Sequence, residues 1–218
     1  EISECLVGSE MCIRDRTETG ADISGRSQSR TRAAVPEFET VSDRVYVNTE
    51  GGAIAENGRQ VLLDPNWDYA EFAKITSGTA VLYQSQTAER KNLTICVNAG
   101  HGTKGGASVK TQCHPDGSPK VTGGTTGAGA VTAAAVSGGM TFDDGTPESS
   151  VTLSMALILK DRLLAKGYDV LMIRETEDVQ LDNIARTLIA NNASDCHIAL
   201  HWDSTSSNKG AFYMSVPN

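Results

Sequence analysis

The chain has 218 residues, of which 39% are hydrophobic, so it is long enough to bury one sizeable core beside a smaller N-terminal segment. Its formal net charge of -8 argues against nucleic acid or an anionic membrane surface as the main partner, because both polyanions recruit basic patches. No apolar run reaches the roughly 18 residues of a membrane span, and no charged-then-apolar segment of the kind that forms a signal peptide opens the chain. The five cysteines lack zinc-knuckle spacing and predict no disulfide framework.

The first 90 residues divide into three predicted segments. Residues 1–16 include ECLVGSEMCIRDR, which is typical of translated sequencing-adapter read-through, and we interpret them as a sequencing artefact. Residues 17–43 are rich in Ser, Thr, Gly and Arg and predict a disordered lead-in. Residues 44–90 contain VYVN, GGAIAENGRQVLL with a hairpin turn at Asn57-Gly58, and TAVLYQ. These patterns predict a small β-rich preface.

Residues 91–218 predict an α/β domain with a mostly parallel sheet and flanking helices. LTICVN, YDVLMIR and CHIALHW are the predicted strands, and a helical pattern lies in each interval between them, an alternation typical of a parallel sheet. The first helix is expected to have Thr146 as its N-cap and Pro147 in its first turn, and to run to Gly167. The predicted core-facing stripes are Val151, Met155, Ile158, Leu159 and Leu163 in the first helix, and Leu181, Ile184, Ala185, Leu188 and Ile189 in the second.

Three residues that can bind a metal are expected at the carboxyl ends of these strands, where parallel sheets place their sites. His101 follows the first strand, His201 ends the third, and Glu148 opens the first helix on its core-facing side. A carboxylate on that side needs a partner, because an unpaired buried charge is costly. Two imidazoles and one carboxylate, with water in the fourth position, are typical of a hydrolytic zinc site, and the imidazoles favour zinc over magnesium.

The same region contains other residues and motifs that could bind a ligand. Residues 100–105 match the dinucleotide pattern G-x-G-x-x-G, but the two prolines and the lack of helical periodicity after it argue against that function. His114 is an alternative fourth ligand, whereas His197 is expected in the core. Asn98 and Asp203 are predicted to orient the imidazole rings of the ligands.

The stretch from about Leu93 to Tyr213 resembles the zinc-dependent N-acetylmuramoyl-L-alanine amidases of the type-3 catalytic domain. The matching motifs are ICVNAGHG, the helix that begins ESSVTLSMALIL, and NIARTLIANNASDCHIALHWDST, in that order. The resemblance implies that His101, Glu148 and His201 are the zinc ligands. It implies that water on the zinc cleaves the amide bond between N-acetylmuramic acid and L-alanine in peptidoglycan. We therefore expect an extracellular or cell-wall hydrolase, and a monomer.

The sequence departs from that family in two respects. The family carries a further glutamate near the C-terminal end of its domain as general base, and this chain ends at Asn218 before such a motif. We therefore expect an incomplete domain that binds zinc but hydrolyses poorly, with its catalytic base unidentified. The alternatives are a non-catalytic peptidoglycan-binding or regulatory zinc domain, and a zinc amide hydrolase that acts on other peptides.

The second departure is a long insertion, residues 103–146, between the first two predicted ligands. Long loops in compact domains are usually functional or disordered, so the insertion is predicted to be a lid or a substrate-selecting flap. Deleting residues 109–139 is then expected to change the preference for wall fragments more than the zinc content.

Overall fold

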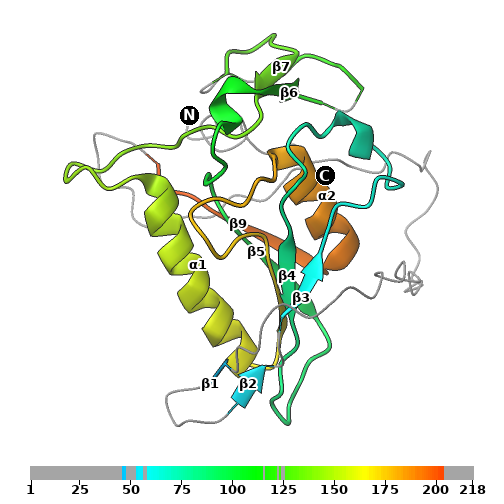
Figure 1. Ribbon diagram of the computed structural model, residues 1–218, viewed down its shortest axis with the longest axis vertical. Coiled ribbons are helices and arrows are strands. Elements are labelled where there is room, and N and C mark those ends of the chain that lie inside the picture. The colour runs from blue at the N-terminus through cyan, green and yellow to red at the C-terminus, as the bar shows by residue number, and fades with distance from the viewer. Residues whose placement is uncertain are drawn as a thin grey trace, which may run out of the picture.

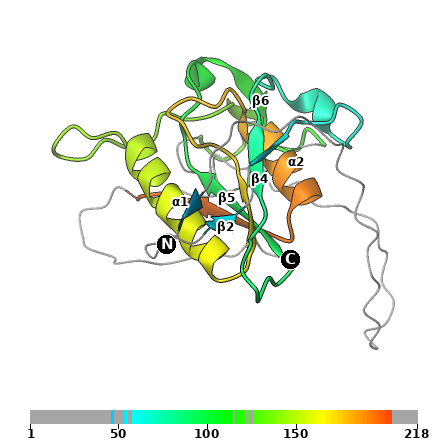
Figure 2. The same ribbon diagram turned by 60° about the horizontal axis from the view of Figure 1, so that its bottom comes forward.

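A computed structural model describes residues 58–114, 116–121, 123 and 126–203, and the backbone of two short strands at 46–47 and 53–55. The predicted artefact and lead-in, residues 1–16 and 17–43, lie outside the described residues. Helices α1 (Glu148–Ala165) and α2 (Asn183–Ala193) lie on opposite sides of a central sheet (Figures 1 and 2). Among the described residues, no helix combines the length and apolar character that crossing a membrane requires.

The central sheet has five strands in the order β3-β4-β8-β5-β9. Strands β5 (Thr94–Ala99), β8 (Asp169–Met172) and β9 (Cys196–Leu200) are parallel and coincide with the three predicted strands. Strands β3 (Arg59–Val61) and β4 (Ala80–Tyr83) extend the sheet in the antiparallel sense beside β8. The predicted α/β fold with flanking helices is confirmed, and the sheet is mixed.

Strands from the β-rich preface belong to this same sheet. The boundary expected between residues 90 and 91 falls between β4 and β5, and the sheet continues across it. The hairpin predicted at Asn57-Gly58 is wrong, because the strands on either side of it lie in different sheets. Strand β2 (Ala53–Ala55) pairs with β1 (Tyr46–Val47), whereas β3 pairs with β4 and buries Val61 in the core.

Successive residues of the central strands alternate between two cores, as expected when both faces of a sheet are covered. On the α2 side Cys96 and Leu171 are fully buried, and on the α1 side Val97 and Met172 are fully buried. The stripe predicted for α2 is confirmed. All five of its residues are buried: Leu181, Ile184, Ala185, Leu188 and Ile189.

The stripe predicted for α1 is wrong in its register. Met155 and Ile158 are 45% and 58% exposed, while Leu159 and Leu163 are only partly buried against the core. The sheet-facing side instead follows four-residue steps from the first residue of the helix, because polar residues on that side have hydrogen-bond partners in the segments that follow the strands. The buried residues of α1 are Glu148, Thr152, Leu153, Ala156, Lys160 and Leu164.

Helix α1 also begins differently from the prediction. Pro147, rather than Thr146, occupies the N-cap position, in an extended conformation that provides no side-chain cap. The amide of Glu148 donates to the carbonyl oxygen of Met140 at 2.9 Å. A backbone group from the preceding segment therefore satisfies one of the first four amides of the helix, which have no partner within it.

The insertion contains ordered structure at the carboxyl edge of the sheet. It includes the short 3-10 helix η2 (Gly106–Ser108) and a hairpin of β6 (Lys110–Gln112) and β7 (Thr132–Ala134). A second 3-10 helix, η1 (Ala70–Phe72), lies in the long connection between β3 and β4. Figure 1 shows the β6–β7 hairpin at the end of the molecule opposite the C-terminal end of α1.

Lys160 is a buried cation on the sheet-facing side of α1. Its side chain is 3% exposed, and Nζ lies 2.6 Å from Oε1 of Glu175. The hydroxyl of Tyr83 donates to the other carboxylate oxygen at 2.6 Å, and Nζ lies 4.7 Å from the centre of the Tyr83 ring. The Glu175 carboxylate thus compensates one buried cation and one buried hydroxyl.

Replacing Glu175 with leucine is expected to lower the free energy of unfolding by about 3 kcal/mol, because Lys160 then loses its counter-charge inside the protein. The double substitution Lys160→Met and Glu175→Leu is expected to recover most of that loss, since it removes the buried charge itself. Urea unfolding of both variants measures the difference. Equal destabilisation of the single and double variants would contradict this account.

Candidate metal centre

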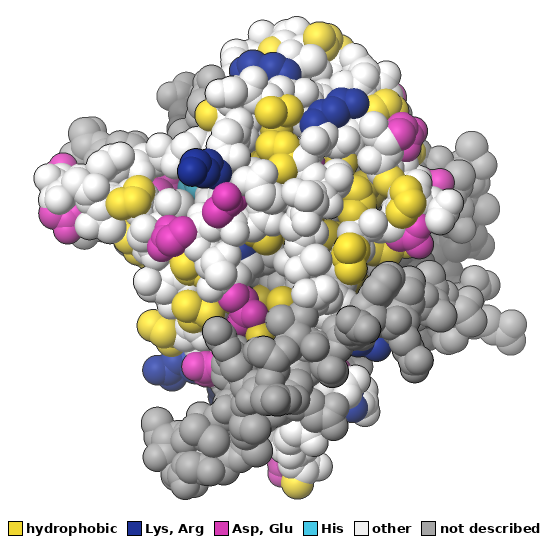
Figure 3. Space-filling model, viewed as in Figure 1, with side chains coloured by type: hydrophobic (Ala, Val, Ile, Leu, Met, Phe, Trp, Pro, Cys, Tyr) yellow, Lys and Arg dark blue, Asp and Glu magenta, His cyan; other side chains and the backbone are white. Residues whose placement is uncertain are grey.

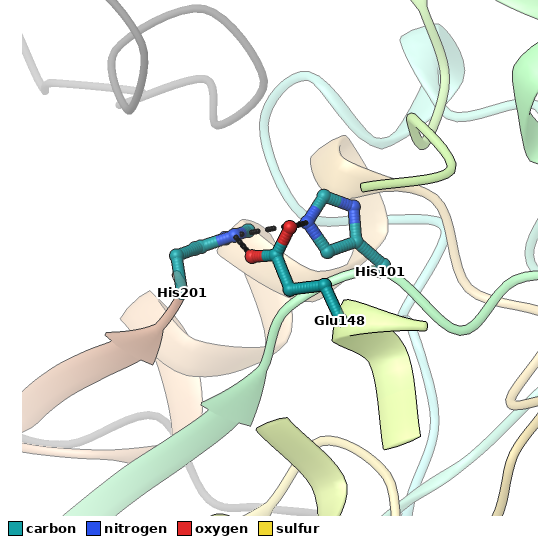
Figure 4. Close-up of side chains that lie close together, drawn as sticks. All are labelled: His101, Glu148 and His201. Carbon is teal, nitrogen blue, oxygen red and sulfur yellow. Dashed lines mark hydrogen bonds and ion pairs between the residues drawn. The ribbon is translucent and has the colours of Figure 1, made fainter. Parts of the chain in front are cut away.

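The register of β5 and β9 brings the two predicted histidine ligands together. Ala99 pairs with Leu200 in the parallel ladder, so the two strands end side by side. The amide of Gly100 continues the ladder by donating to the Leu200 carbonyl at 3.0 Å. His101 and His201 therefore leave the same edge of the sheet. Figure 4 shows both rings converging on Glu148 at the start of α1.

The three side chains approach one another at hydrogen-bond distance. Nε2 of His101 lies 3.0 Å from Oε2 of Glu148, and Nδ1 of His201 lies 3.1 Å from Oε1 of the same carboxylate. The two imidazole nitrogens are 3.1 Å apart, and the rings are nearly perpendicular, at 88°. These residues form the one group of three or more His, Cys, Asp or Glu residues arranged to hold a metal ion within the described part of the chain.

Glu148 is 2% exposed, so its charge depends on its neighbours. Besides the two histidines, the backbone amides of Met140 and Trp202 donate to its two oxygens at 2.9 and 2.8 Å. Burial raises the pKa of the Glu148 carboxyl, but the hydrogen bonds from the histidines and these amides outweigh burial and hold that pKa well below its usual range. The carboxylate is therefore ionised at neutral pH and available as a ligand.

A backbone carbonyl of the insertion fixes the tautomer of His101. Nδ1 lies 2.8 Å from the carbonyl oxygen of Ser137, which only accepts hydrogen bonds, so Nδ1 carries the proton. Nε2 is then the ring atom that can bind a cation; its hydrogen bond to Glu148 requires a proton on Nε2, and a metal ion would take the place of that proton. Without that proton, lone pairs from the three groups repel unless a cation lies among them, and two imidazoles with one carboxylate suit zinc. The residues present therefore fit a zinc ion, with one coordination position left for water or substrate.

Two glycines allow the His101 loop to pass close to its neighbours. A Cβ at Gly100 would lie 2.3 Å from the His201 ring, so a side chain at position 100 would displace that ligand. Gly102 has a φ of 72°, and its Cβ would lie 2.6 Å from the Arg174 guanidinium. His101 itself has a φ of 63°, a left-handed conformation that is uncommon for residues other than glycine. The surrounding packing therefore holds a ligand in a strained backbone conformation.

Two buried arginines clamp this loop from opposite sides, and the sequence analysis did not assign them this role. Arg174 donates to the carbonyl oxygens of Ala99 and Gly100 at 3.0 and 2.9 Å. Arg186 donates to the His101 carbonyl at 2.7 Å and to the Ala99 carbonyl at 3.2 Å. Burial lowers the pKa of Arg174 to about 10, while Glu177 raises it in part, so the guanidinium stays cationic at neutral pH.

The other residues singled out from the sequence have distinct positions. The Asn98 amide contacts Nε2 of His197 at 3.2 Å and accepts from Arg186 at 3.3 Å, so its predicted role beside a ligand imidazole stays a prediction. Asp203 is half-buried two residues after His201, and its predicted role also stays a prediction. The metal-binding group in the described residues does not include His114, so the structure does not support a fourth ligand from the insertion.

Comparison with known protein families gives a match that spans the metal centre. The family model described as N-acetylmuramoyl-L-alanine amidase matches residues 95–215, which is more than half of the chain. The matched range contains His101, Glu148 and His201, and it confirms the resemblance inferred from the sequence motifs. No curated protein and no solved structure matches the chain.

Proposed function

The chain belongs to the N-acetylmuramoyl-L-alanine amidase family, and on that basis we propose that it uses zinc to hydrolyse the bond between N-acetylmuramic acid and L-alanine. The general activity of this family is that of a peptidoglycan amidase. The observation that carries the proposal is the convergence of two imidazole nitrogens and one carboxylate, each within 3.1 Å of a neighbour, at the carboxyl edge of the sheet.

Each residue of the site has a separate task in this proposal. His101, His201 and Glu148 bind the ion, and Ser137 holds the His101 ring in the tautomer that turns Nε2 toward it. Arg174 and Arg186 fix the backbone that carries His101. Zinc in such a site lowers the pKa of bound water toward about 7 and polarises a carbonyl group, which are the two requirements of amide hydrolysis.

The proposed substrate indicates where the protein works. Peptidoglycan lies outside the cytoplasmic membrane, so we propose that the protein works at the cell wall or in the extracellular space. We propose further that it acts as a monomer, because all three ligands come from one chain.

Purified peptidoglycan incubated with the zinc-loaded chain is expected to release peptides with a new amino-terminal alanine and no new reducing sugar ends, because the cut separates the lactyl group from the peptide. The release is expected to be slow, in keeping with the poor hydrolysis expected from the sequence. Quantifying free amines and reducing ends distinguishes this cut from glycan cleavage. A chelator is expected to stop the release, and added zinc to restore it.

The matched control is Glu148→Ala, which removes a ligand and is expected to release no peptide. Release of reducing ends in place of alanine amines would overturn the proposed bond. Zinc binding and peptidoglycan binding without release of either product would favour the non-catalytic peptidoglycan-binding alternative.

A further inference from the structure

Residues 135–140, here called the return arm, follow β7 and lead the insertion back across the metal centre. We propose that the return arm is a positioning element of this centre, with Ser137 and Gly139 as positioning residues, so that metal binding and arm docking stabilise one another. The inference rests on the proposed function, because it concerns the same zinc site. It gives the insertion a role at the metal that is separate from any contact with substrate.

The return arm contacts two of the three ligands through its backbone. The Ser137 carbonyl accepts from His101, and the Met140 amide donates to Oε2 of Glu148 at 2.9 Å. The Met140 carbonyl in turn accepts from the Glu148 amide at 2.9 Å. A shift of the arm would therefore break the hydrogen bonds that orient the ring of His101 and the carboxylate of Glu148. Outer partners of this kind typically change metal affinity by about 10- to 100-fold.

Gly139 shows how closely the arm approaches the ligand atoms. A Cβ at this position would lie 2.9 Å from Nε2 of His101 and 2.8 Å from Oε2 of Glu148, two of the atoms that would hold the ion. Its φ of 79° is also unfavourable for residues with a side chain. The neighbouring Gly138 has open space around its Cβ position and no left-handed φ. The two adjacent glycines therefore provide a test position and a matched control.

The arm is anchored at its start by burial and backbone hydrogen bonds. Ala135 and Val136 are 0% and 2% exposed. The Ala135 amide donates to the Val109 carbonyl at 2.8 Å, and the Ala135 carbonyl accepts from the first amide of α2, that of Asn183, at 3.1 Å. The position of the arm thus depends on the body of the domain and not only on the hairpin before it.

The β6–β7 hairpin beyond the anchor is more exposed. Val121 and Val131 are 86% and 51% exposed, and the part of Figure 3 where Figure 1 places the hairpin carries apolar and basic side chains. Replacing residues 113–131 with Asn-Gly would join Gln112 to Thr132 in a two-residue turn and leave the arm in place. Deleting residues 109–139 also removes all of the arm except Met140, so zinc affinity is expected to fall in that deletion, contrary to the expectation from sequence.

Coupling between metal and arm is reciprocal by thermodynamic linkage. If docking of the arm strengthens zinc binding, zinc must strengthen docking of the arm by the same factor. Zinc is therefore expected to slow amide exchange at Met140, whose amide donates to Glu148, and to leave exchange in the distant C-terminal half of α1 unchanged.

The experiment compares zinc affinity, measured by competition with a chromogenic chelator, among the wild-type chain, Gly139→Ala, Gly138→Ala and the 113–131 replacement. Gly139→Ala is expected to bind zinc at least tenfold more weakly. Gly138→Ala and the hairpin replacement are expected to stay within about twofold of wild type, because neither touches the ligands. Circular dichroism confirms that each variant is folded, and hydrogen exchange on the wild type with and without zinc provides a measurement that needs no variant.

The outcomes separate this inference from the proposed function. A wild-type chain that binds zinc, with Gly139→Ala and Gly138→Ala equal in affinity and no zinc-dependent protection at Met140, would overturn the positioning role and leave the metal site standing. A folded wild-type chain without zinc affinity would overturn the proposed function, and this inference with it.

Discussion

Alanine in place of His101, Glu148 or His201 is expected to lower the zinc affinity of the chain by more than about 100-fold, beyond the range seen for loss of an outer partner. Each substitution removes one of the three ligand atoms, and the remaining two do not enclose the ion. Elemental analysis after dialysis against dilute chelator measures the effect. The wild-type chain is expected to retain about one zinc per chain, as a site with three protein ligands predicts, and each variant close to none.

The matched control for this series is His114→Ala, which removes a histidine that lies outside the metal-binding group. It is expected to retain zinc at the wild-type level. A folded His101→Ala variant that keeps its zinc, or a His114→Ala variant that loses it, would show that the ion is held elsewhere. Either result would refute the three-ligand site.

Replacing Arg186 with methionine is expected to lower the free energy of unfolding by about 3 to 5 kcal/mol. Arg186 is 1% exposed, and its guanidinium donates to three backbone carbonyls, those of Leu181, Ala99 and His101. Methionine fills much of the volume but leaves these acceptors without that donor inside the protein. Since whole domains are stable by only about 5 to 15 kcal/mol, the variant is expected to be close to unfolding.

Urea unfolding followed by circular dichroism measures this loss, with the exposed Arg162→Ala in α1 as control. The control is expected to change stability by less than about 0.5 kcal/mol, apart from a small helix-propensity effect. Arg186→Lys is expected to recover only part of the loss, because an ammonium group cannot reproduce the fork of donors on a guanidinium. Comparable stability of Arg186→Met and wild type would mean that water replaces the guanidinium at these carbonyls.

Glu148 shows how a correct site residue can follow from a partly wrong helix register. The apolar residues of α1 placed Met155 and Ile158 on the core-facing side, and both are exposed. Glu148 is nevertheless buried, because the sheet-facing side includes polar residues with partners. Thr152 donates to the Gly100 carbonyl at 2.9 Å, and Lys160 pairs with Glu175. Hydrophobic periodicity misses such a face, since it counts a satisfied polar residue as exposed.

The β-rich preface and the return arm show which contacts local sequence patterns do not predict. A hairpin signal at Asn57-Gly58 was present, but the pairing of β3 was decided by β4, which lies 19 residues or more along the chain from its partners. Ser137 carries no sequence signal for contact with His101, because a backbone carbonyl acts there and any residue has one. Long-range pairings and backbone contacts depend on how the chain closes in space.

The sequence by itself determined the three parallel strands and the two helices of the α/β domain, the metal-binding residue types and the edge of the sheet where they meet. It did so because strand ends and helix starts are local features, and parallel strands direct them to one side. Only the tertiary structure decided that β3 and β4 complete the sheet, that two buried arginines fix the His101 loop, and that the return arm closes the metal centre. These features join residues that are distant in the chain, and their energies come from burial and hydrogen bonds that exist only after folding.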